Sequence, residues 1–78
     1  MSKPGTRHAL KQLRKRIAMN MHRYRRRRWL TPSECATRAG ISCENWYLYE
    51  EGRGNMTLQA LLQVSTALGI QPEDLMVE

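Results

Sequence analysis

The stretch PSECATRAGISCENWYLYEEGR, residues 32–53, decides the fold. It predicts two short helices joined by the turn Gly40-Ile41-Ser42. Ala36 is small, as two helices that cross near a right angle require, because its Cβ then lies against the other backbone. Gly40 suits a turn that needs a positive φ. The apolar positions that would face a core are Cys35, Ala36, Ala39, Ile41, Trp46 and Tyr49.

Residues with known capping preferences mark where these two helices begin and end. Thr31 is suited to cap the first helix, Pro32 to occupy its first position, and Glu34 to complete a capping box. The glycine of the turn ends this helix in the left-handed conformation. Ser42 is suited to cap the second helix, which we expect to end near Glu51.

Three further helices are predicted outside this pair. Residues from about Thr6 to about Arg28 form a long first helix, because apolar residues recur every three or four positions at Leu10, Leu13, Ile17, Met21 and Tyr24. Thr57 caps a fourth helix that ends at Gly69 and whose expected core face is Leu58, Leu61, Leu62, Val64 and Leu68. Pro72 starts a last short helix that carries Leu75 and Met76.

The predicted fold is therefore all-α: a compact domain of five helices with a long basic first helix. Residues 1–6 are expected to form a flexible basic tail and residues 7–78 the domain, with residues 32–51 at its centre. A chain of 78 residues with 41% hydrophobic residues is enough for one small core. An enzyme, a metal site or a cofactor is not expected, and no segment is apolar enough for a membrane span. The two cysteines fit a reducing cytosol as free thiols.

Charge is distributed unevenly along the chain. Residues 1–30 hold eleven basic side chains and no acidic one, whereas residues 31–78 hold two basic and seven acidic side chains, for a net charge of +6. Such an asymmetry indicates that one end of the molecule faces a polyanion. The alternative is a basic helix that is merely solvated.

Three segments in order carry a resemblance to a known family. They are residues 31–36 leading to 40–42, residues 49–53, and residues 58–70 followed by 72–75. The chain from about Ile17 to Leu75 resembles the phage-repressor/Cro-like (XRE-type) helix-turn-helix DNA-binding family. The resemblance implies a five-helix repressor-like domain whose third helix enters the major groove of DNA. It also implies a structural ion pair between Arg25 and Glu50.

The same docking mode assigns candidate DNA-binding residues. Those expected on phosphates are Arg25, Arg26, Arg27, Arg28 and Arg53. Those at the family's base-reading positions are Cys43, Glu44, Tyr47 and Leu48. None of the latter is a Gln, Asn or Arg, which make the common bidentate contacts with bases. Pro32 also departs from the family, which often has a phosphate-binding Gln there.

These observations predict a transcriptional regulator that acts as a repressor and binds double-stranded DNA as a homodimer in a bacterial cytoplasm, at the nucleoid. Leu75, Met76 and Val77 could form the dimer surface or could instead cover the core of their own domain. Three alternatives stay open. The acidic third helix could bind a partner protein, as in an interaction module or an antitoxin; Arg23 to Arg28 could bind RNA; and oxidation of Cys43, in the first turn of that helix, could alter DNA binding.

Overall fold

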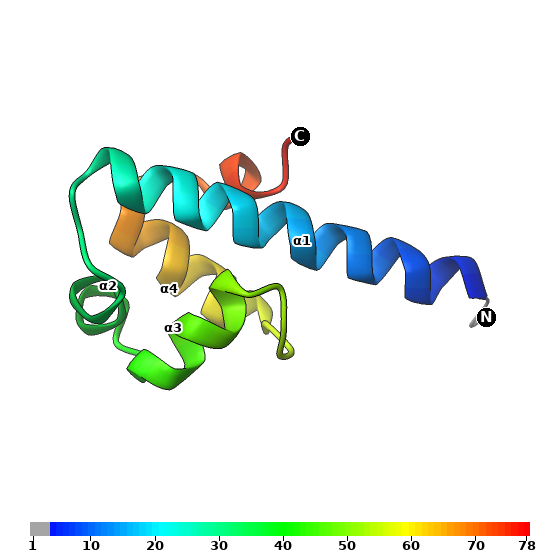
Figure 1. Cartoon of the computed structure of the whole chain (residues 1–78), viewed down its shortest axis with the longest axis horizontal. Helices are drawn as coiled ribbons and strands as arrows, with labels where there is room; N and C mark the ends of the chain where they lie inside the picture. The colour runs from blue at the N-terminus through cyan, green and yellow to red at the C-terminus, as the bar shows by residue number, and fades with distance from the viewer. Residues whose placement is uncertain (1–3) are drawn as a thin grey trace.

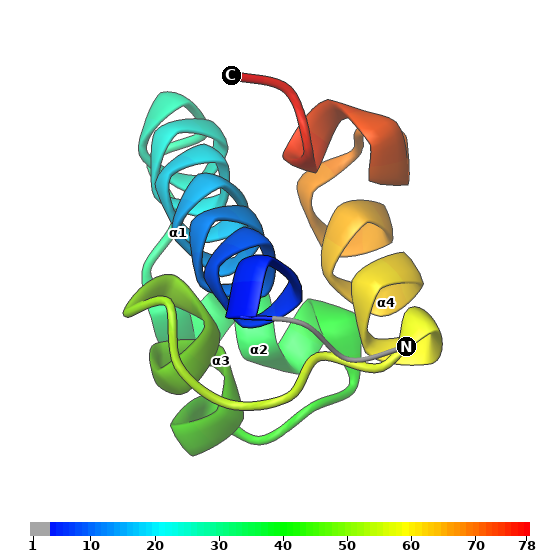
Figure 2. The ribbon, with the colours of Figure 1, turned by 90° about the vertical axis from the view of Figure 1, so that its right-hand side faces the viewer.

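A computed structural model describes residues 4–78, which fold into four α-helices and one short 3₁₀ helix. The elements are α1 (Pro4–Arg27), α2 (Pro32–Ala39), α3 (Cys43–Glu50), α4 (Leu58–Leu68) and η1 (Pro72–Leu75). No strand occurs within the described residues. Helix α1 packs on α3, α4 and η1, and its N-terminal end extends beyond the other helices (Figures 1 and 2).

Two of the predicted features need correction. The fifth element is a 3₁₀ helix and not an α-helix, because its amides donate to carbonyls three positions back: Asp74 to Gln71 and Met76 to Glu73. The predicted tail is helical from Pro4 onward, so residues 4–6 belong to α1, while residues 1–3 lie outside the described part of the chain.

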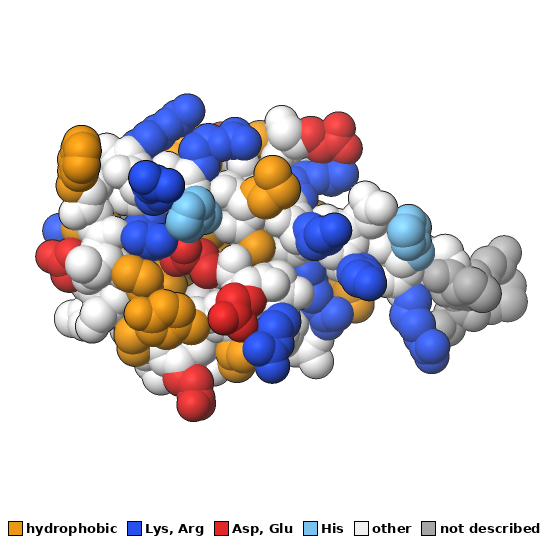
Figure 3. Space-filling view, viewed as in Figure 1, with side chains coloured by type: hydrophobic (Ala, Val, Ile, Leu, Met, Phe, Trp, Pro, Cys, Tyr) orange, Lys and Arg blue, Asp and Glu red, His pale blue; other side chains and the backbone are white. Residues whose placement is uncertain are grey.

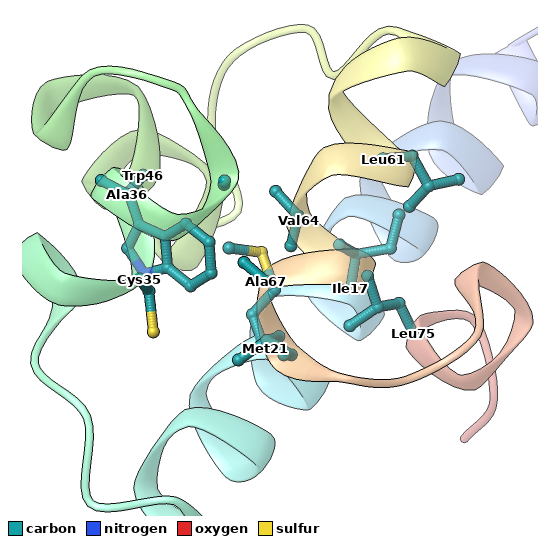
Figure 4. Packing of buried hydrophobic residues seen from close by; sticks show 11 residues of the cluster. Ile17, Met21, Cys35, Ala36, Trp46, Leu61, Val64, Ala67 and Leu75 are labelled. Carbon is teal, nitrogen blue, oxygen red and sulfur yellow. The ribbon is translucent and has the colours of Figure 1, made fainter.

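The core lies where α1, α2, α3, α4 and η1 converge. Trp46 of α3 and Met21 of α1 are fully buried, and they meet side chains of α4 such as Val64 (Figure 4). Cys35 and Ala36 close the core from α2. The buried cluster is Ile17, Met21, Cys35, Ala36, Ala39, Trp46, Leu61, Val64, Ala67, Leu68 and Leu75.

The predicted start signals are confirmed. Thr31 Oγ1 accepts a hydrogen bond from the Glu34 amide at 3.1 Å, and the Glu34 carboxylate accepts one from the Thr31 amide at 2.8 Å, which completes the capping box. Ser42 caps α3 and Thr57 caps α4 through hydroxyl-to-amide bonds of 3.0 Å. These local bonds satisfy amides that a helix end otherwise leaves unpaired.

All four α-helices end in the same way, with a residue in the left-handed conformation. At each end, the amide after that residue reaches back five positions along the chain to a carbonyl, which is the Schellman arrangement. The left-handed residue is a glycine after α2, α3 and α4: Gly40 (φ 73°), Gly52 (φ 75°) and Gly69 (φ 69°). After α1 it is Trp29 (φ 56°).

The predicted core faces of two helices were partly wrong. Leu58 and Leu62 are exposed, and α4 instead buries Ala60, Leu61, Val64, Ser65, Ala67 and Leu68. In α1, Leu10 is 44% exposed because this part of the helix projects past the body of the domain.

Candidate nucleic-acid interface

An ion pair joins α1 to α3 at the centre of the candidate interface. Nε of Arg25 lies 2.9 Å from Oε2 of Glu50, and Nη2 lies 2.9 Å from Oε1. Both side chains are largely buried, with exposed fractions of 14% and 10%. Nη1 of Arg25 also donates to the Leu30 carbonyl at 2.9 Å, so this side chain holds the turn after α1 as well.

Glu50 accepts from further donors. The Trp46 indole N–H donates to Oε2, and Nδ1 of His22 lies 3.0 Å from Oε1. Burial by itself would raise the pKa of Glu50, but hydrogen bonds from Arg25, His22 and Trp46 outweigh it and hold that pKa below its ordinary value. The carboxylate is therefore charged at neutral pH and links α3 to the His22 and Arg25 side chains of α1.

The four candidate base-reading residues differ in exposure. Glu44 and Tyr47 are exposed on the outer side of α3, Tyr47 to 51%. Cys43 and Leu48 are half-buried, and Cys43 packs against the core. The outer side of α3 therefore offers a carboxylate and a phenol to a ligand more readily than a thiol or a leucine.

The arginines at the end of α1 have different surroundings. The guanidinium carbons of Arg27 and Arg28 each lie 5.6 Å from the centre of the Tyr24 ring, within the range of a cation–π contact. Arg28 also donates to the Tyr24 carbonyl at 3.2 Å. Arg26 is exposed, and none of the ion pairs found among the described residues includes it. Arg26 and Arg27 are thus the most available of the predicted phosphate contacts.

A shallow groove between α1 and the end of α3 brings several of these residues together. Its lining is Ala18, Met19, His22, Arg23, Arg26, Arg27 and Glu50. The DNA-binding residues assigned from the sequence did not include Arg23 or His22, and Arg23 was named only for the RNA-binding alternative. Arg23 precedes Arg26 and Arg27 by three and four positions, so helical spacing alone could have identified it. Figure 3 shows basic side chains along α1 on the face that also carries acidic and apolar side chains of the lower helices.

Two predicted phosphate contacts have internal partners. The donors of Arg25 are directed at Glu50 and Leu30, so it serves the fold. Nη1 of Arg53 lies 3.0 Å from Oε1 of Glu51, but both side chains are more than half exposed. Such an exposed pair contributes little energy, and a phosphate can therefore compete for this arginine.

The predicted dimer surface needs correction. Leu75 is fully buried in the core and cannot contact a second chain, whereas Met76 and Val77 are 36% and 54% exposed. Val77 shares an open groove with Met19 of α1, which is 63% exposed. In the described part of the chain, no helix is long and apolar enough to cross a membrane, and no three His, Cys, Asp or Glu side chains gather as metal ligands would.

Comparisons with known proteins agree with this geometry. Residues 16–77 match the family model described as helix-turn-helix domain. The chain is 35% identical over 63 residues to an uncharacterized HTH-type transcriptional regulator, y4dJ, of Sinorhizobium fredii. The matched stretch covers 81% of this chain and 82% of the relative. It also resembles the crystal structure of a hypothetical transcription factor, NHTF, from Neisseria, with a TM-score of 0.81 and 26% identity over 86% of this chain and 78% of that one.

Proposed function

Because the chain belongs to the helix-turn-helix domain family, we propose that it is a DNA-binding transcriptional regulator that acts as a repressor. Helix α3 enters the major groove with Glu44 and Tyr47 toward the bases, and Arg26 and Arg27 bind phosphates. Arg28 and Arg53 are further phosphate contacts. The protein acts as a homodimer at the nucleoid of a bacterial cytoplasm.

The observation that carries this proposal is the ion pair between Arg25 and Glu50. The pair connects α3 to α1. It therefore holds the outer side of α3 at a constant position relative to the basic groove of Arg23, Arg26 and Arg27. A rigid helix beside a row of guanidinium groups suits a duplex, since phosphate contacts set the position and base contacts give specificity. A repressor needs no more than occupancy of its site.

Selection of the protein on random duplexes at near-physiological salt tests sequence reading directly. We expect a motif with two inverted half-sites about one helical turn apart. Recovery of duplexes without any shared motif would overturn specific recognition.

Phosphate binding is tested separately by the salt dependence of affinity. In the double variant Arg26→Gln/Arg27→Gln, the slope of log affinity against log salt should be less steep by about 2, because each lost phosphate contact removes roughly 0.9. Arg16→Gln is the control, since Arg16 lies on the same helix but outside this groove, where it pairs with Glu78 at 2.7 Å. Equal slopes in the double variant and the control would contradict the assignment.

The acidic outer side of α3 supports a second candidate function. Glu44 and Glu51 repel phosphates, and with Tyr47 between them they suit a basic surface of a partner protein, as in an antitoxin. In this case Glu44→Lys weakens binding of that partner and leaves DNA binding unchanged.

A further inference from the structure

Among the described residues, Trp29 is the one non-glycine residue with a left-handed backbone, and its large side chain is not buried. It is 93% exposed, the highest exposure among the large hydrophobic residues of the described chain. Its φ of 56° is a left-handed value that disfavours any residue other than glycine. The fold gains no packing from the indole to offset this strain, and such outliers cluster at functional sites.

The position of Trp29 points to its ligand. It directly follows the run of four arginines at positions 25–28, and it stands two residues before the cap of α2. The first acidic residue along the chain is Glu34, and its carboxylate is held in the capping box. A basic partner is therefore repelled from this corner, whereas a polyanion is attracted to it. The turn lies at the corner where α1 passes to α2 (Figure 1).

We propose that the indole of Trp29 packs against the sugar–phosphate backbone of duplex DNA, beside the phosphates bound by the neighbouring arginines. This inference rests on the proposed function. The deoxyribose presents apolar C–H groups between charged phosphates, so an aromatic ring flanked by guanidinium groups matches its chemistry. The contact adds affinity without releasing counterions and without reading sequence.

The salt dependence of binding distinguishes this contact from an ionic one. We would measure the affinity for a fluorescein-labelled duplex of mixed sequence, about two helical turns long, by anisotropy over a range of salt. Trp29→Gly should weaken binding by about fivefold to tenfold at every salt concentration and leave the slope unchanged. Trp29→Tyr should retain most of the affinity. Leu58→Ala, which removes another exposed apolar side chain (85%), is the matched control and should bind as the natural chain does.

The two tryptophans also allow a direct observation of the contact. Trp46 is fully buried and Trp29 almost fully exposed, so acrylamide quenches the emission of Trp29 selectively. Addition of the duplex should protect Trp29 from acrylamide, and in Trp29→Phe this protection should disappear.

Three results would overturn the inference, and they have different meanings. If the duplex binds with its usual salt slope but Trp29→Gly binds equally well, the ring makes no contact with DNA. If Trp29→Gly converts a dimer into a monomer in the absence of DNA, the ring lies in a protein interface. If the natural chain shows no binding of DNA at any salt, the proposed function itself fails.

Discussion

At the end of α1, a tryptophan occupies the left-handed position that glycine occupies after the other three α-helices. Glycine adopts this conformation without the steric cost that a Cβ imposes. We expect Trp29→Gly to raise the free energy of unfolding by about 1 kcal/mol, measured by urea denaturation. Trp29→Ala removes the ring but keeps the strained backbone, so it should leave stability nearly unchanged. A Gly variant no more stable than the Ala variant would contradict the backbone strain, and an Ala variant less stable than the natural chain would show that the ring supports the fold.

Glu50 links the fold to pH. Its folded pKa is lowered, so its contribution to stability is complete above the ordinary carboxyl pKa and is lost as pH falls through the folded value. At neutral pH, Glu50→Gln should reduce the free energy of unfolding by about 2 kcal/mol, because Arg25 loses a charged partner in a largely buried place. The difference between the two proteins should shrink as the solution is acidified. A constant difference across the titration would contradict this role.

At the scale of one helix, the charge of α3 decides which ligand it favours. Glu44 is exposed on the side of α3 that would face a DNA groove, where its carboxylate meets the negative potential of the phosphates. Glu44→Lys should therefore strengthen DNA binding, by about threefold to tenfold at low salt. Anisotropy with a mixed-sequence duplex measures this change. Tighter binding of a basic partner protein by the natural chain, with no effect of the variant on DNA, would favour the interaction module instead.

The elements that could be predicted from the sequence are those that local chemistry determines. The capping box of Thr31 and the stops at Gly40 and Gly69 depend on residues within a few positions, so the bounds of α2 and α4 were accessible. Which side of a helix faces the core depends on distant partners. Helical spacing could not show that α4 buries Ala60 and Ala67 and leaves Leu58 and Leu62 in solvent.

The candidate site, like the fold, could be predicted only in part from the sequence. The partnership of Arg25 with Glu50 came from the family resemblance, because residues 25 positions apart give no local signal. Arg23 was named for RNA binding but not among the DNA-binding residues, since the run of four arginines after it dominated the pattern. The sequence left open whether Leu75 lies on a dimer surface or in the core of its own domain, because its burial depends on how η1 packs against α1 and α4.

For the whole molecule, the proposed dimer now rests on Met76, Val77 and Met19. Met19 and Val77 line one open groove. If a second chain covers this groove, an acidic side chain placed there loses its hydration, which destabilises the dimer. We expect Met76→Asp/Val77→Asp to shift sedimentation from dimer to monomer. Leu58→Asp changes an apolar residue that is exposed elsewhere on the molecule (85%) and should not. A double variant that keeps the mass of a dimer would remove this surface from consideration.

The N-terminal part of α1 contributes positive charge to the molecule but no side chain to its buried core. Residues 5–12 are exposed and precede the family match at residue 16, so a chain that starts at Leu13 should keep its core and melt within a few degrees of the natural protein. It loses Lys3, Arg7 and Lys11, and with them part of the electrostatic field that attracts a polyanion toward the groove.

The loss of this charge should slow the association of the shortened chain with DNA. Stopped-flow measurements should show association slowed by about threefold to tenfold at low salt and by little at high salt, because salt screens the long-range attraction. Full-length Arg7→Gln/Lys11→Gln should reproduce most of the effect. A loss that persists at high salt would instead mean that this segment touches the DNA.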